Sequence, residues 1–143
     1  MRPVKAIIVG VMVDVIGTTI IAGLIGLVLG FYLLSHGVSE EELEVVLIEK
    51  VMEAPWNMVG FALGAAISIL AGYITAKIAK DRVYFYAGVV GCISGIFGYW
   101  MGLGYYSDPI NAALSLLAIV SAIFGAFLWL KKNTPNRDRE LLK

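Results

Sequence analysis

The chain has 143 residues and a formal net charge of zero, with 59% hydrophobic and 15% charged residues. Its mean hydropathy of +0.85 is too high for an ordinary soluble domain. The single cysteine, Cys92, excludes an internal disulfide and a cysteine-based zinc cluster, and its apolar surroundings predict a buried packing residue. The high hydropathy predicts a lipid bilayer as the partner of the chain. No nucleic-acid-binding motif is present, so no nucleic acid is expected as a partner.

Four apolar segments are long enough to span a bilayer, which takes about 20 residues. They lie at about 6–34, 56–76, 83–103 and 110–130. The first is too long for the apolar part of a cleaved signal peptide, so we expect a retained span. Short links after the second and third segments make consecutive helices antiparallel neighbours. The predicted fold class is therefore all-α: a polytopic membrane protein with an antiparallel bundle of four transmembrane helices, forming one domain over 1–132, and a short polar tail at 133–143.

The first span places a carboxylate, Asp14, inside an apolar helix. A charged side chain near the middle of a membrane helix costs about 2.5–3.5 kcal/mol and normally faces a partner, a cavity or water. Gly10, Gly17 and Thr18 share the helix face of Asp14. Because glycine allows a neighbouring helix to come close, this face is expected to pack inside the bundle. Two interpretations stay open: Asp14 is a proton or cation site, or it is a carboxylic acid that is hydrogen-bonded to another helix and only stabilises packing.

A short amphipathic helix is predicted over Ser39–Ala54, in the loop after the first span. Gly37 is suited to end the first helix, and Ser39 followed by Glu42 has the spacing of a capping box. Apolar residues recur at helical spacing between glutamates, and Pro55 separates this helix from the next span. The segment is either an interfacial helix over the mouth of the bundle or a docking surface for a basic partner.

Small residues recur at helical spacing in every span. The rows are Gly10, Gly17, Gly26 and Gly30 in the first span, Gly60, Gly64, Ser68, Gly72 and Ala76 in the second, Gly88, Gly91, Gly95, Gly98 and Gly102 in the third, and Ala118, Ala122 and Ala126 in the fourth. In lipid, helices associate through close backbone approach, which small residues permit. We therefore expect glycine-rich helix packing in a tight bundle.

Basic residues are distributed unevenly between the two sides of the expected bundle. Ten of the eleven lie before the first span, between the second and third, or after the fourth, and only Lys50 lies in the acidic loop. By the positive-inside rule, both termini are cytoplasmic and the acidic loop faces outward. The expected location is the cell (plasma) membrane, crossed by several spans.

Counting 1.5 Å per helical residue from the basic side places Asp14 about 12 Å deep. Ser68, Cys92 and Ser121 fall at about the same depth in the other three spans. Ser68 belongs to the small-residue row of the second span, which favours an inward orientation. The candidate proton or substrate site is therefore Asp14, with Thr18, Ser68 and Ser121 lining its path.

The second and fourth spans begin alike. Pro55-Trp-Asn57 and Pro109-Ile-Asn111 each open a span, and each reaches a lysine, Lys77 or Lys131, after the same 22 steps. Two tandem helical hairpins would give this pattern, as would convergence on similar span requirements. We favour convergence.

The spans offer little for enzymatic chemistry. The only histidine, His36, lies in the outer loop, so a histidine-based triad within the membrane is excluded. No His-Glu-x-x-His motif or carboxylate pair occurs in the spans, and Gly91-Cys-Ile-Ser94-Gly95 lacks the register of a nucleophile elbow. No enzyme activity, catalytic residue, metal or cofactor is predicted.

The segment Val13-Asp14-Val-Ile-Gly-Thr18-Thr resembles the first helix of the small multidrug resistance transporters, four-span exporters that carry Ala-Glu-Val-Ile-Gly-Thr-Thr there. The resemblance implies that Asp14 exchanges protons for a cationic or polar substrate, with Thr18 beside it. The chain departs from the family in having Asp for Glu, an added outer loop and different later helices. Separately, 71–80 followed by a glycine-rich span resembles uncharacterised small four-span prokaryotic integral membrane proteins, which implies no activity.

Two functional hypotheses follow. Abundant packing faces and few reactive groups favour first a non-enzymatic structural or complex-forming membrane component, as a homo-oligomer or within a larger membrane complex. The alternative is a proton-coupled small-molecule transporter in which Asp14 is the proton or substrate carboxylate. A water-accessible cavity at the depth of Asp14 would favour transport, and a dry, interdigitated layer would favour packing.

Overall fold

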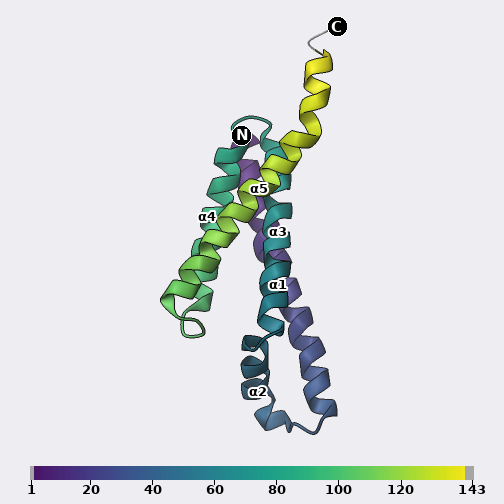
Figure 1. The fold of residues 1–143 in the computed structure, drawn as a ribbon, viewed down its shortest axis with the longest axis vertical. Helices are drawn as coiled ribbons and strands as arrows, with labels where there is room; N and C mark the ends of the chain where they lie inside the picture. Colours follow the sequence, from purple (N-terminus) through teal and green to yellow (C-terminus); the bar gives the residue numbers. More distant parts are fainter. Residues whose placement is uncertain (1, 141–143) are drawn as a thin grey trace.

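The protein is described by a computed structural model over residues 2–140, and this part of the chain contains five helices (Figure 1). They are α1 (Arg2–Ser35), α2 (Glu40–Met52), α3 (Trp56–Ala79), α4 (Val83–Gly102) and α5 (Asp108–Glu140). All of them except α2 are long and apolar enough to cross a membrane. The prediction of an all-helical chain with four such segments is thus confirmed.

The helices begin and end close to the predicted bounds, with two extensions. α1 starts at Arg2, and α5 continues beyond the predicted span to Glu140. Part of the segment expected to be a polar tail is therefore helical. A helix that is already formed extends into polar sequence without a new nucleation step, although Pro135 in this extension has no backbone N–H to donate.

α1 ends at the glycine that the sequence indicated. Gly37 has a φ of 89°. Its N–H donates to the carbonyl of Leu34, and the N–H of Val38 donates to the carbonyl of Leu33. These two bonds satisfy carbonyl groups that the helix end would otherwise leave unpaired. A residue with a Cβ would be strained at this φ, so glycine is strongly favoured here.

The predicted amphipathic helix is present as α2, with Ser39 as its N-cap residue. The backbone N–H of Glu42 donates to Ser39 Oγ at 3.4 Å, and Ser39 Oγ donates to Glu42 Oε2 at 3.1 Å. Near the other end, Lys50 and Glu53 form an exposed ion pair at 2.8 Å, and Glu53 raises the pKa of Lys50 through this hydrogen bond and its charge. A pair this exposed contributes little to stability.

The molecule consists of two helical hairpins that cross (Figure 1). α1 and α3 pack together and are joined through α2, while α4 and α5 form the second hairpin, which packs against α3. The N-terminus and the turn between α3 and α4 lie at one end, which we call the basic end because it carries Lys80 and Arg82. The opposite end, where α1 leads into α2, we call the α2 end. There the tip of the α4–α5 hairpin stands apart from α2.

Helix packing is closest toward the basic end. α3 and α5 cross at Gly72 and Gly125: a Cβ added to Gly72 would overlap the backbone carbonyl oxygen of Ala122, and one added to Gly125 would overlap that of Ile69. Backbones approach this closely only where side chains are absent. The buried cluster on the basic-end side of this crossing consists of Ala76, Val83, Ala87 and Ala126.

The same small-residue rows are open toward the α2 end. A Cβ added to Gly60, Gly64 or Gly98 would meet no atom within 4 Å. The tight bundle that these rows predict is therefore not formed at these three glycines, although a Cβ on Gly102, at the same end, would overlap the Asn111 side chain. The reason is the crossing of the two hairpins, because helices that cross at an angle touch near the crossing and diverge away from it.

Asn57 and Asn111, at equivalent places in the two similar span starts, make the same local hydrogen bond. Nδ2 of Asn57 donates to the carbonyl of Met52 at 3.1 Å, and Nδ2 of Asn111 donates to the carbonyl of Tyr106 at 3.3 Å. Asn111 also donates to the carbonyl of Gly102. The similarity in sequence thus accompanies the same way of fixing a helix start to the preceding loop.

Cys92 is exposed, which corrects the prediction of a buried packing residue. Its neighbour Gly91 is buried in α4. Successive residues of a helix are rotated by about 100° about the helix axis. The side chain of Cys92 can therefore face outward although the residue before it, Gly91, is buried. The apolar residues that flank Cys92 in the sequence do not distinguish these two faces.

Candidate functional site

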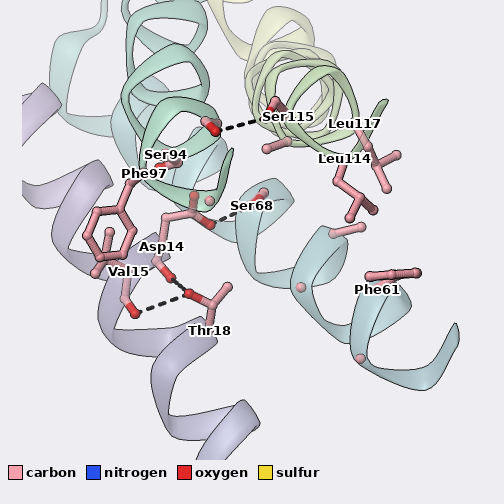
Figure 2. Close-up of a pocket in the computed structure, with 16 residues that line it drawn as sticks. Asp14, Val15, Thr18, Phe61, Ser68, Ser94, Phe97, Leu114, Ser115 and Leu117 are labelled. Carbon is pink, nitrogen blue, oxygen red and sulfur yellow. Dashed lines mark hydrogen bonds between the residues drawn. The ribbon is translucent and has the colours of Figure 1, made fainter. Parts of the chain in front are cut away.

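Asp14 and Ser68 form a hydrogen bond that joins α1 to α3. Ser68 Oγ donates to Asp14 Oδ1 at 2.8 Å (Figure 2). The two residues are only 4% and 5% exposed. A hydrogen bond to a charged group contributes about 1.5–3 kcal/mol, which offsets part of the penalty for burying a carboxylate. The depth count along the helices had placed these two residues at one level.

Two glycines allow α1 to hold Asp14 against the other helices. Gly10, one turn earlier, leaves space that the Thr75 side chain of α3 occupies. Gly17, about one turn later, leaves space for Ile67, whose Cγ2 atom would lie 2.7 Å from an added Cβ. At both positions a residue larger than glycine would force the neighbouring side chain to move. The packed face predicted around Asp14 is therefore present.

A cavity of about 240 Å³ lies beside the Asp14–Ser68 pair, and α1, α3, α4 and α5 all line it (Figure 2). We call it the Asp14 cavity. The polar side chains that line it are Asp14, Thr18, Ser68, Ser94 and Ser115. The apolar walls include Phe61, Phe97, Leu114 and Leu117. A few polar groups among apolar side chains are typical of a small-molecule site.

Thr18 and Ser121, the other two predicted site residues, do not bind the Asp14 carboxylate. Thr18 Oγ1 donates to the backbone carbonyl of Asp14 at 2.7 Å, although Thr18 does line the cavity. Ser121 is buried in α5, with 6% exposed, but does not line the cavity. Depth along a helix does not specify the direction in which a side chain points, which is why these two residues differ from Ser68.

The cavity also contains two serines that the sequence prediction missed. Ser115 Oγ donates to the carbonyl of Gly95 at 2.9 Å and to that of Asn111 at 2.9 Å, so it ties α5 to α4. Ser94 is 9% exposed, and its Oγ atom has no hydrogen-bond partner among the described residues. Ser94 follows the buried Gly91 by three residues, so it shares the inward face of α4, and this spacing was the available signal.

A second cavity extends the first toward the α2 end. It measures about 420 Å³, and we call it the α2-side cavity. The residues that line both cavities are Thr18, Gly60, Phe61, Gly64 and Gly98. Its far part is lined by Met52 of α2, by Trp56 and Asn57 of α3 and by Tyr105 and Tyr106 in the loop before α5. Because they share these five lining residues, the two cavities are neighbours, and together their lining extends from Asp14 to the α2 end.

On the other side of Asp14 the helices are in close contact. Thr75 fills the space beside Gly10, and its hydroxyl donates to the carbonyl of Ala71 in its own helix at 2.8 Å. Val90 of α4, also beside Gly10, is fully buried. Asp14 therefore lies at the boundary between the packed half of the molecule and the half that contains the cavities.

Ser68→Ala is expected to lower the free energy of unfolding by about 1.5–3 kcal/mol, because it removes the hydroxyl that donates to a buried carboxylate. Ser121→Ala removes a serine of similar burial that does not donate to a carboxylate, and should lower this free energy by no more than about 1 kcal/mol. Denaturant unfolding of the detergent-solubilised variants measures both values. Equal effects of the two substitutions would show that the Ser68–Asp14 bond does not stabilise the fold.

The geometry allows Asp14 to exchange a proton or to bind a hydrogen-bond donor from the cavity. Its carboxylate lines the cavity, and Ser68 occupies only the Oδ1 atom. Among the described residues, no group of three or more His, Cys, Asp or Glu side chains is placed to hold a metal ion. Comparison of the chain with protein-family models, with curated proteins and with solved structures found no match.

Proposed function

We propose that the chain is a polytopic membrane protein in which α1, α3, α4 and α5 cross the cell (plasma) membrane, with both termini cytoplasmic and α2 outside. The charges support this orientation, since Arg2 and Lys80 lie together at the basic end whereas Lys50 is the only basic residue of α2. The outer surface of the helices is rich in large apolar side chains, and Phe31 and Ile96 are each 72% exposed. Lipid is a better solvent than water for such a surface.

We further propose that the protein is a proton-coupled transporter of a small molecule, with Asp14 as the proton or substrate carboxylate. The observation that carries this proposal is the position of Asp14 in the wall of a cavity whose neighbour, with five shared lining residues, extends to the α2 end. On its other side, Thr75 and Val90 fill the space beside Gly10 and are fully buried. This is the arrangement expected for one state of a protein that exposes its site to each side in turn.

The residues around Asp14 have separate roles in this proposal. Ser68 orients the carboxylate by holding Oδ1. No described residue donates to the other oxygen, Oδ2, so this atom is left to take up a proton or to contact a substrate. Gly64 and Gly98 provide the width of the cavity, because their missing side chains leave open space.

Filling the cavity tests the proposal. Gly64→Leu adds a side chain where a Cβ meets no atom within 4 Å, so the variant should fold, and its solute-driven proton flux should fall close to that of protein-free vesicles. Gly88→Leu is the matched control, because its Cβ position is equally open and Gly88 lines neither cavity. Flux is measured in proteoliposomes that contain a pH-sensitive dye, with gradients of small amines, amino acids and sugars applied in turn. Equal flux in the two variants would exclude the cavity as the transport path.

A structural or complex-forming role is the second candidate, and two glycines of α1 favour it. A Cβ added to Gly23 or Gly26 would meet no atom within 4 Å, so this part of α1 leaves room for a helix of another chain. Crosslinking in native membranes tests this role. A dimer or larger complex linked through α1 would support it, and a monomer without any partner would count against it.

A further inference from the structure

Two buried side-chain atoms of the described residues have no hydrogen-bond partner, and both belong to residues that line the cavities. They are Ser94 Oγ and Asn57 Oδ1. A buried polar group that stays unpaired costs about 1–3 kcal/mol, so each such atom in a folded protein points to a partner outside the chain. Ser94 lines the Asp14 cavity, and Asn57 lines the α2-side cavity.

Ser94 faces the same space as the Asp14–Ser68 pair but comes from a different helix. It belongs to α4, whereas Asp14 and Ser68 belong to α1 and α3 (Figure 2). Its hydroxyl can donate one hydrogen bond and accept others, and so can a water molecule. Water in the cavity can therefore bond to Ser94 and to the free Oδ2 atom of Asp14.

Asn57 offers an acceptor in the neighbouring cavity. Its Nδ2 atom donates to the carbonyl of Met52 at 3.1 Å, which fixes the amide and leaves Oδ1 free. Tyr106 lines the same cavity, and burial raises the pKa of its phenol, so it stays neutral and keeps its O–H group near neutral pH. The titratable side chains that line the two cavities are Asp14, Tyr105 and Tyr106.

The two cavities have room for water. One molecule of liquid water occupies about 30 Å³, so volumes of about 240 and 420 Å³ correspond to about eight and about fourteen molecules. An apolar cavity stays dry, because a buried water needs two to four polar partners. Asp14 and Ser94 supply such partners in the Asp14 cavity, and Asn57 supplies one in the α2-side cavity.

We propose that Ser94 and Asn57 anchor a chain of water molecules that carries protons between the α2 end and Asp14. The inference rests on the proposed proton-coupled function. It adds the path that protons follow to Asp14 and the end of the molecule, the α2 end, from which they come. Each water passes one proton to the next and receives one from behind. The last water gives its proton to Asp14 Oδ2, which becomes a carboxylic acid, and one proton leaves the solution at the α2 end.

The packed side chains on the basic-end side of Asp14 give the route its direction. The hydroxyl of Thr75 is bound to its own helix, and Val90 and Ala76 are fully buried and apolar. A proton that approached from that end would meet these buried apolar side chains, and burial of an unpaired charge is strongly unfavourable. Protons are therefore exchanged with the α2 side while the protein has this conformation.

Thiol labelling from each side tests the route. In a Cys92→Ala background, Ser94→Cys places a thiol of similar size beside the proposed water chain. Ser121→Cys is the matched control, because Ser121 is also buried but lines neither cavity. The probe is 2-aminoethyl methanethiosulfonate, applied to one face of oriented proteoliposomes with free cysteine on the other face to quench reagent that crosses. Mass spectrometry gives the extent of modification.

The reagent needs a thiolate, which forms in contact with water and not in apolar packing. Applied at the α2 side, it should therefore modify Ser94→Cys at least about tenfold faster than Ser121→Cys. From the basic end both variants should react slowly. The route is overturned by a Ser94→Cys rate no higher than that of the control, or by equal rates from the two faces.

A second measurement follows the proton itself. Infrared difference spectra after a pH jump record the carbonyl band of protonated Asp14, which is identified by its absence in Asp14→Asn. Ser94→Ala and Asn57→Leu should each slow the rise of this band by about tenfold, because each removes one hydrogen-bonding anchor of the water chain. Ser121→Ala should leave the rate unchanged. Unchanged rates in both cavity variants would contradict the proposal.

The outcomes separate the water route from the transport function. If Asp14→Asn abolishes solute-driven flux while Ser94→Cys stays unreactive from the α2 side, the transport function stands and the route is wrong. If Ser94→Cys reacts from the α2 side while Asp14→Asn keeps its flux, the route stands and Asp14 is not the coupling residue.

Discussion

Asp14→Asn is expected to abolish solute-driven proton flux in proteoliposomes while the protein still folds and inserts. Asparagine is close to aspartate in size, and its amide oxygen can accept the hydrogen bond that Ser68 Oγ donates. Its side chain has no ionisable proton to exchange, so the substitution removes the proton step and little else. A pH-sensitive dye trapped in the vesicles measures the flux, which should fall to the level of protein-free vesicles.

Two further variants make this result interpretable. Asp14→Glu keeps an ionisable carboxyl group and should retain part of the flux, because the longer side chain moves that group relative to Ser68. Ser121→Ala should retain the full flux, because Ser121 lines neither cavity. Full flux in a correctly folded Asp14→Asn variant would leave Asp14 as a packing residue and would favour the structural or complex-forming role.

Gly72→Ala and Gly88→Ala are expected to change the free energy of unfolding in opposite directions. A Cβ on Gly72 would overlap the backbone carbonyl of Ala122, so α3 and α5 would have to move apart at their crossing. Overpacking destabilises by about 1–3 kcal/mol, and a backbone clash places this variant at the upper end, at about 3 kcal/mol or more. At Gly88 no atom lies within 4 Å of an added Cβ, and alanine in place of a helical glycine stabilises by about 0.5–1 kcal/mol.

Thermal and denaturant unfolding of the detergent-solubilised proteins, followed by tryptophan fluorescence, measures both changes. Gly125→Ala tests the same crossing from the other helix, because its Cβ would overlap the carbonyl of Ile69. A Gly72→Ala variant as stable as the original protein would mean that α3 and α5 are not in backbone contact. A destabilised Gly88→Ala variant would mean that loss of any helical glycine, and not the crossing, causes the effect.

The local features of the fold could be predicted because they depend on residues that are close together in the chain. The lengths of the apolar runs indicated the four long helices. Gly37 ends α1 in a left-handed conformation, and Ser39 caps α2 through the N–H of Glu42. Each of these features needs hydrogen bonds over about one helical turn, and such bonds follow from residue type and spacing.

The candidate site could be predicted only in part. Depth along the helices placed Asp14 and Ser68 at one level, and both face inward because each lies in a row of small residues. The same depth argument included Ser121, which lies outside the cavities, and it omitted Ser94, which lies inside. Depth depends on position in the chain, whereas inclusion in a cavity depends on how each helix is rotated about its axis. That rotation is set by contacts with the other helices.

Residue type and spacing alone indicate four apolar helices, the end of α1 at Gly37 and a carboxylate among small residues. Which members of each small-residue row pack depends on contacts between the helices. Gly72 lies against Ala122, whereas Gly64, about two turns earlier in the same row, faces the cavity beside Asp14. Both glycines belong to one row at a spacing of four residues, and this spacing does not separate them. They differ because the two hairpins cross at an angle, and that angle results from contacts between segments far apart in the chain.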